Sequence, residues 1–91
     1  MRKRVSIKIF GIVQGVFFRE STREKANELG LSGFVRNESD GSVYIDAEGS
    51  EEDLRGLISW CHQGPRLSRV DRVDYDFIPK LEDYQEFEIR F

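Results

Sequence analysis

The hydrophobic residues of this chain switch repeatedly between the spacing of a β-strand and that of an α-helix. Apolar residues three or four apart predict one helix from near Phe18 to Leu29, and a second between Ser50 and Gly64-Pro65. Strict alternation of apolar and polar residues predicts five strands, over roughly Arg4 to Ile12, Gly33 to Asn37, Val43 to Ala47, Val73 to Phe77 and Phe87 to Phe91. The predicted order is therefore β-α-β-β-α-β-β.

This order favours one architecture. Two helices on one face of a mainly antiparallel sheet bury all the apolar stripes, with right-handed crossovers at each β-α-β step. We therefore expect the α+β, ferredoxin-like split β-α-β sandwich. Because 91 residues cannot supply two independent cores, residues 1–91 are predicted to form a single domain. The fold alone does not indicate a function.

The predicted helix ends carry recognisable signals. Gly30 is a natural stop for the first helix, with Leu31 placed for the hydrophobic contact that often follows such a glycine. Ser50 followed by Asp53 resembles a capping box at the start of the second helix. The buried stripe of that helix is predicted to be Leu54, Leu57, Ile58 and Cys61.

Composition and charge exclude several classes of protein. Fourteen basic and 17 acidic side chains leave a net charge of −3, so no whole face is basic enough for phosphate-backbone binding. One cysteine and one histidine provide neither an internal disulfide nor a zinc site, and we expect no metal and no cofactor.

The first residues of the chain resemble a signal peptide only superficially. The apolar stretch after Arg2-Lys3-Arg4 is interrupted by Ser6 and Lys8, and no small-residue cleavage site follows. No run of residues is long enough to span a bilayer. We expect an unprocessed, cytoplasmic monomer that binds neither membranes nor nucleic acid.

The segment from Gln14 to Arg19 joins the first strand to the first helix. Such a junction points backbone N–H groups and the positive helix end at one place, which suits an anion, although a tight turn at Gly15 also explains it. The positive charge of Arg19 opposes the helix dipole. Either a carboxylate such as Glu20 pairs with Arg19, or Arg19 binds an anionic ligand.

Asn37 has a structural and a functional interpretation, whereas Cys61, His62 and the carboxylates have a structural one. Asn37 is either a turn residue that bonds local backbone or an amide that orients a water molecule. Cys61 is expected to be a buried, inert thiol, and His62 a capping or surface group. The many carboxylates show no recognisable paired spacing, so we expect them on solvated faces.

Two segments resemble the signatures of the acylphosphatase family. The sequence from Gly11 to Arg19, GIVQGVFFR, is similar to the first signature, G-x-V-Q-G-V-x-F-R. The sequence Gly33 to Asn37, followed by Asp40-Gly41, Val43 and Gly49, resembles the second. Gly64-Pro65 is also typical of the family, and the resemblance covers the whole chain.

The resemblance implies a function and a set of residues. Arg19 and Asn37 would be the catalytic pair, and the substrate-binding residues would be Gln14, Gly15, Val16, Phe17, Phe18 and Arg19. The reaction would be hydrolysis of acyl phosphates to a carboxylate and inorganic phosphate, with phosphate also a competitive inhibitor. The alternatives are a non-catalytic regulatory module and an RNA-binding module of the same fold. The RNA-binding alternative has only Phe10 and Tyr44 as candidate stacking residues.

Overall fold

The elements of the computed structural model, which describes residues 1–91, follow the predicted order. They are β1 (Arg2–Ile12), α1 (Phe18–Glu28), β2 (Ser32–Asn37), β3 (Val43–Ser50), α2 (Glu51–Gln63), β4 (Arg69–Ile78) and β5 (Phe87–Arg90). β4 begins at Arg69, ahead of the predicted Val73. It does so because a register shift between Phe10 and Gly11 lets β1 continue pairing as far as Ile12, opposite Arg69.

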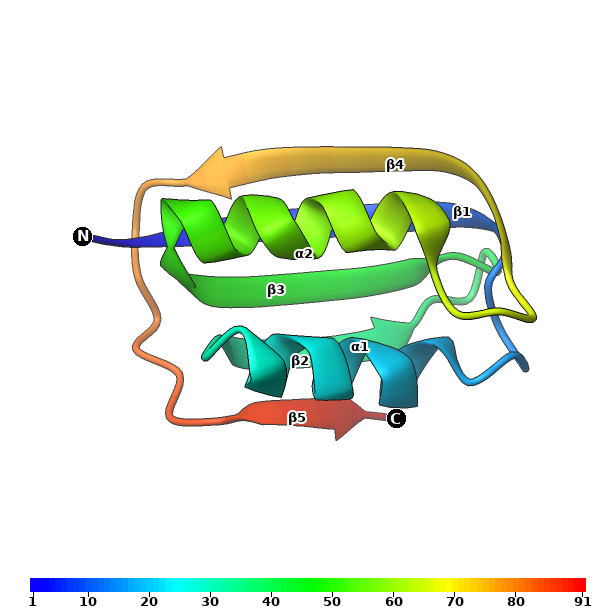
Figure 1. The fold of residues 1–91 in the computed structure, drawn as a ribbon, viewed down its shortest axis with the longest axis horizontal. Coiled ribbons are helices and arrows are strands. Elements are labelled where there is room, and N and C mark those ends of the chain that lie inside the picture. The colour runs from blue at the N-terminus through cyan, green and yellow to red at the C-terminus, as the bar shows by residue number, and fades with distance from the viewer.

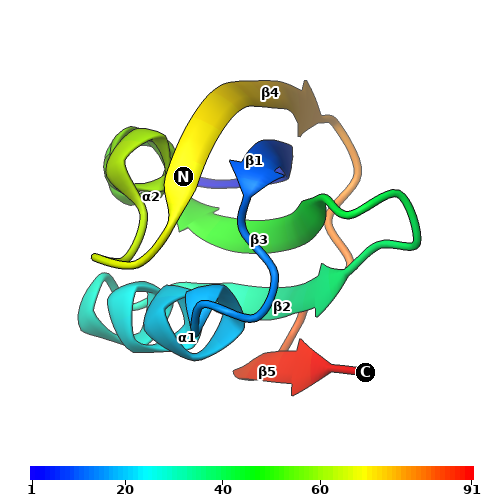
Figure 2. The same cartoon turned by 90° about the vertical axis from the view of Figure 1, so that its right-hand side faces the viewer.

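The strands form one sheet in the order β4-β1-β3-β2-β5. All pairs are antiparallel except β2 with β5, which is parallel. Both helices cover the same face of this sheet (Figure 1; Figure 2). The ferredoxin-like arrangement expected from the sequence is confirmed. No helix is both long and apolar enough to span a membrane.

The core fills the space between the helices and the sheet. Alternate residues of β1 and β3 point into it, and the predicted stripe of α2 packs against them. Sixteen buried residues form this cluster, among them Val5, Ile7, Ile9, Val43, Ile45, Leu54, Leu57 and Cys61. Each fully buried aliphatic side chain stabilises the fold by about 1.5–3 kcal/mol. Because this core fixes the register of β1 and β3, it also fixes where the loops at their ends lie.

The other face of the sheet is crossed by the connection between β4 and β5, which we call the strap (residues 79–86; Figure 2). Under it lie two carboxylates that were predicted to be solvated, and that prediction is wrong: Asp46 is 2% exposed and Glu48 is fully buried. Both side chains leave β3 on the face opposite the core, where the strap excludes water. Sequence spacing does not reveal a cover supplied by a distant segment.

Both buried carboxylates have strong partners. Arg4 donates two hydrogen bonds to Asp46, of 2.9 and 2.8 Å, and this pairing raises the pKa of the Arg4 guanidinium. Glu48 accepts a bond from Arg2 at 3.0 Å. It also accepts the backbone N–H groups of Glu82, of Asp83 at 3.3 Å and of Tyr84 at 3.1 Å. Glu48 therefore binds three consecutive amides of the strap. Two further bonds join the strap to the sheet, from Arg4 to Lys80 O at 3.2 Å and from Gly33 N–H to Glu86 O at 2.9 Å.

Candidate active site

The two helices begin in opposite ways. α2 is capped by Ser50, which accepts the N–H of Asp53, and its first turn carries Glu51, Glu52 and Asp53. α1 has no side-chain cap, and its N-cap residue, Phe17, has left-handed backbone angles of φ 65° and ψ 26°. Such a conformation costs a non-glycine residue about 1–3 kcal/mol. The start of α1 is therefore strained and lacks the groups that normally satisfy a helix end.

The backbone N–H groups at this end are available to a ligand. The bond from Ser21 N–H to Phe17 O, at 3.1 Å, closes the first turn of α1, and the N–H groups of Val16 and Phe17 donate to no backbone acceptor. Gly15 also has a positive φ, of 75°. Successive amides in a turn of this kind converge on one concave side, which binds anions.

A cavity of about 250 Å³ opens at this loop. Its walls come from the β1–α1 connection, the first turn of α1, the end of β2 and β5. The lining residues are Val13, Gly15, Phe17, Phe18, Arg19, Glu20, Asn37, Ile89 and Phe91. The structure therefore brings Arg19 and Asn37 to one cavity, while Gln14 and Val16 do not line it.

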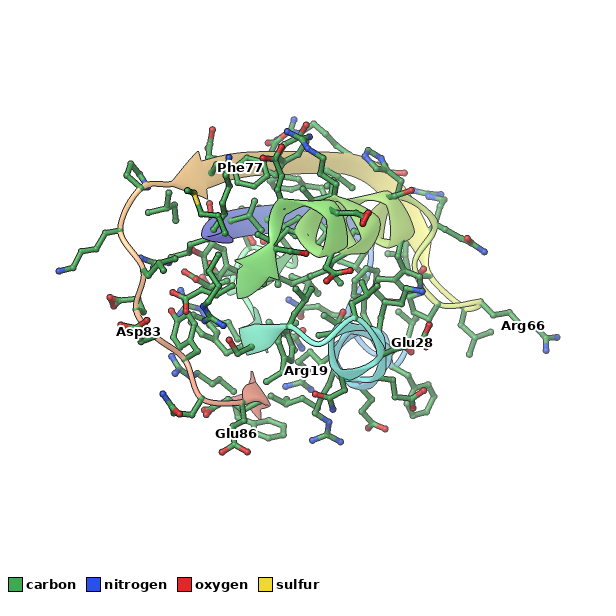
Figure 3. The ribbon with its side chains drawn as sticks, turned by 60° about the vertical axis from the view of Figure 1, so that its left-hand side comes forward. Arg19, Glu28, Arg66, Phe77, Asp83 and Glu86 are labelled. Atoms are coloured by element: carbon green, nitrogen blue, oxygen red, sulfur yellow. The ribbon has the colours of Figure 1, made fainter.

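Arg19 enters this cavity without a carboxylate partner. No acidic oxygen lies within 4.0 Å of its guanidinium, so the alternative in which Glu20 pairs with it is wrong. The guanidinium instead lies 4.7 Å from the centre of the Phe91 ring. Figure 3 shows Arg19 between α1 and β5. A positive charge without an acidic partner, in the first turn of a helix, is suited to an anion.

Asn37 carries the one buried side-chain polar atom of the protein that has no hydrogen-bond partner, its Oδ1. A buried oxygen left unpaired costs about 1–3 kcal/mol. The turn after β2 does not use the Asn37 amide. Asp40 Oδ1 closes that turn by accepting the Ser42 N–H at 2.9 Å, and the bonds from Ser42 and Lys8 lower the pKa of Asp40. The residue with the unpaired oxygen is therefore one of those that line the cavity.

The side chain of Gln14 reaches across to the hairpin that ends β2. Its Nε2 donates to Glu38 O at 2.8 Å and to Ser42 O at 2.9 Å. These bonds fix the β1–α1 loop relative to the residue that follows Asn37. No sequence pattern predicts this bridge, since both acceptors are main-chain carbonyls. No pattern predicts the positions of Ile89 and Phe91 either, because only the β2–β5 pairing brings β5 to the cavity.

The remaining candidate residues lie elsewhere. Cys61 is buried in the core as predicted, and desolvation raises the pKa of its thiol. His62 is exposed on the last turn of α2. No group of three or more His, Cys, Asp or Glu side chains is placed to hold a metal ion. A wider depression of about 620 Å³, next to the strap, contains no buried polar side-chain atom without a partner.

Comparison with known proteins shows which family the chain resembles. The family model described as acylphosphatase matches residues 5–89. An acylphosphatase of Salinibacter ruber is 49% identical over 97% of this chain and 93% of its own. The solved structure of an acylphosphatase from Coxiella burnetii has a TM-score of 0.94 at 40% identity, covering 98% of this chain and 93% of that one. The crystal structure of acylphosphatase from Bacillus subtilis has a TM-score of 0.95 at 33% identity over 100% of both chains. The chain belongs to the acylphosphatase family.

Proposed function

We propose that Arg19 and the backbone N–H groups from Gly15 to Arg19 bind the phosphoryl group of an acyl phosphate, while Asn37 orients the attacking water. Hydrolysis of acyl phosphates is the reaction of the family, and the chain is a hydrolase acting on acid anhydrides. The observation that carries the assignment of residues is the unpaired Oδ1 of Asn37 in the same cavity as the unpaired charge of Arg19.

The chemistry requires stabilisation of negative charge. In phosphoryl transfer the transition state is loose, and its charge is spread over three equatorial oxygens. A planar guanidinium can give two parallel hydrogen bonds to such oxygens, and preorganised amides add further donors. The departing carboxylate is a good leaving group, so no general acid is needed.

The water attacks phosphorus as the bond between phosphorus and the acyl oxygen breaks. The carboxylate leaves with the bonding electron pair. We propose that Asn37 Oδ1 accepts one hydrogen bond from the water, because this buried oxygen has no other partner. The proton that the water loses is taken up by an oxygen of the phosphate itself. Inorganic phosphate, the product, would occupy the same donors and compete with the substrate.

The RNA-binding alternative finds less support. Phe10 and Tyr44 lie on the strap side of the sheet, where cations already cover their rings. Arg72 lies 4.2 Å from the centre of Phe10, and Arg36 lies 4.9 Å from that of Tyr44. Each of these arginines also pairs with an acid, Asp74 or Glu38. This face offers neither free stacking surfaces nor an unbalanced positive charge.

The test is turnover of an aromatic acyl phosphate, with and without EDTA, by the wild type and by Arg19→Lys and Arg19→Gln. We expect turnover without added metal. Arg19→Lys should lose both rate and phosphate affinity because it replaces a planar fork by a point charge. Arg19→Gln should lose at least as much, while its thermal stability holds or rises slightly.

Arg23→Gln is the matched control, since Arg23 lies one helical turn away, exposed and outside the cavity. Unchanged phosphate affinity in both Arg19 variants, or a large loss of stability in either, would make Arg19 a structural residue. Activity that EDTA abolishes and magnesium or zinc restores would contradict the mechanism.

A further inference from the structure

A second depression adjoins the cavity that contains Arg19 and Asn37, which we call the anion cavity. It has a volume of about 480 Å³ and is lined by Val16, Phe17, Ser21, Pro65, Arg66 and Leu67. Phe17 belongs to the walls of both hollows. The two hollows therefore share one aromatic side chain as their common boundary.

Two apolar side chains of this depression lie outside the core, whereas Val16 packs against it. Phe17 is 66% exposed and Leu67 is 65% exposed. The left-handed backbone of Phe17 keeps its ring at the surface, whereas its neighbour Phe18 is buried. Large apolar side chains gathered in one hollow, next to a catalytic pocket, are typical of a ligand contact.

The opposite wall is a preformed turn. Ser68 donates to Pro65 O through its backbone N–H, at 2.9 Å, and through its hydroxyl, at 2.6 Å. Gly64 packs directly against the Phe18 ring, where a Cβ would lie only 2.8 Å from a ring carbon. The turn that carries Leu67 is thus fixed against the first residue of α1. The depression exists before any ligand arrives.

The direction of the reaction relates the two hollows. In phosphoryl transfer the attacking and leaving oxygens lie roughly in line, on opposite sides of phosphorus. Figure 2 shows the β1–α1 loop between the end of β2, which carries Asn37, and the α2–β4 connection. A water held by Asn37 would attack from the β2 side. The acyl group would then leave on the side of Pro65 and Leu67.

We propose that the depression formed by Val16, Phe17, Ser21, Pro65, Arg66 and Leu67, the acyl groove, binds the acyl group of the substrate. An aryl or branched acyl group would bury more apolar surface against Leu67 than an acetyl group, so truncation of Leu67 should affect the larger substrate more. This inference rests on the proposed function, since it requires the phosphoryl group to lie beside Arg19.

The test compares kcat/KM for benzoyl phosphate and acetyl phosphate in the wild type, Leu67→Ala and Ile12→Ala. Truncation of a contact to an apolar substrate group typically costs about tenfold. We therefore expect the benzoyl-to-acetyl ratio to fall about five- to tenfold in Leu67→Ala, through a higher KM for benzoyl phosphate at nearly constant kcat. Ile12 is 50% exposed, precedes the same loop and lines neither hollow, so Ile12→Ala should leave the ratio unchanged.

The outcomes separate the groove from the proposed function. A wild type that hydrolyses both substrates, with a ratio that Leu67→Ala does not move, overturns the acyl groove and leaves the function intact. An equal fall in both variants also overturns it, because the effect would not be local to Leu67. A folded wild type that hydrolyses neither substrate overturns the proposed function and the groove together. Thermal unfolding of each variant verifies that the protein compared is folded.

Discussion

Asn37 shows what a single residue can reveal about a site. Its side chain makes no hydrogen bond within the protein, although its Oδ1 is buried. Stability alone would favour an apolar residue there, because an unpaired buried oxygen is a cost. The unpaired atom is therefore a cost to stability that the proposed role of Asn37 would explain.

Asn37→Ala should lower kcat by about 10²-fold or more, because it removes the group that orients water in the transition state. The free energy of unfolding should change by less than about 1 kcal/mol, since no internal hydrogen bond is lost. Steady-state kinetics with phosphate as a competitive inhibitor would check this, and the inhibition constant should stay the same. Asn27→Ala, an amide outside the cavity, is the control. Full activity in Asn37→Ala would return the residue to a structural role.

Cys61 provides a prediction about pH. Burial raises the pKa of its thiol above the ordinary value of 9.0, so the folded protein keeps it neutral where the unfolded chain ionises. Its contribution to stability is therefore complete below about pH 9 and declines as the pH rises further. The native thiol should not react with an aromatic disulfide reagent at pH 8, and should react fully in denaturant. Rapid reaction of the native protein would show that Cys61 is accessible.

Single residues also show how far sequence reasoning reaches. Arg19 and Asn37 were predicted to act together, and the structure brings them to one cavity. The burial of Asp46 and Glu48 could not be predicted, because the strap that covers them is distant in the sequence and contacts β3 only in the folded protein. Local patterns report neighbours along the chain, whereas burial depends on every segment that packs nearby.

At the scale of elements, the two ends of α1 make a matched pair. Gly15 precedes the helix with φ 75°, and Gly30 follows it with φ 71°. A Cβ built on either glycine meets no atom within 4 Å. Both positions therefore require the left-handed backbone conformation, yet only Gly15 lines the anion cavity.

Gly15→Ala and Gly30→Ala should each lower the free energy of unfolding by about 1 kcal/mol, because both force an L-residue into the left-handed region. Only Gly15→Ala should weaken phosphate binding, because only Gly15 lines the cavity that contains Arg19. Urea unfolding and phosphate titration of the two proteins would measure both effects. Equal phosphate affinity in the two variants would mean that Gly15 serves only the turn.

Elements were easier to predict than their ends. The alternation of Val73, Tyr75 and Phe77 predicted β4, yet the strand extends back to Arg69. Its first residues carry charges, and their pairing depends on the irregularity at Gly11 in β1. A Cβ at Gly11 would lie 2.1 Å from Arg69 O, so the close approach itself requires glycine. The partner strand therefore sets this boundary.

At the scale of the whole molecule, the point where the strap leaves β4 and the loop beside the cavity of Arg19 and Asn37 lie at opposite ends. The β1–α1 loop and the α2–β4 connection meet at one end, and the strap leaves β4 at the other (Figure 1). Glu48 alone holds three backbone N–H groups of the strap. Glu48 therefore makes more hydrogen bonds to the strap than any other side chain of the sheet.

Glu48→Gln should lower the free energy of unfolding by about 2–4 kcal/mol. The glutamine oxygen is a weaker acceptor than a carboxylate, and the glutamine NH₂ group would face the backbone N–H groups of the strap, which are also donors. Arg2→Ala should cost less, since the strap amides keep their acceptor. Glu82→Gln, an exposed carboxylate on the strap itself, should stay within about 0.5 kcal/mol of the wild type. Urea unfolding of the three variants would test this ranking. A Glu48→Gln protein as stable as Glu82→Gln would contradict it.

The strap also implies an order of folding. β4 and β5 are consecutive in sequence but lie at opposite edges of the sheet, and β5 pairs only with β2, through Gly33 to Arg36. Because β5 follows every other element in the chain, its pairing with β2 is the last that a chain under synthesis can form. The amide loop and Arg19 come from a contiguous stretch, whereas Ile89 and Phe91 arrive with β5. In a nascent chain the loop between β1 and α1 is therefore made early, and the cavity is completed only when β5 pairs with β2.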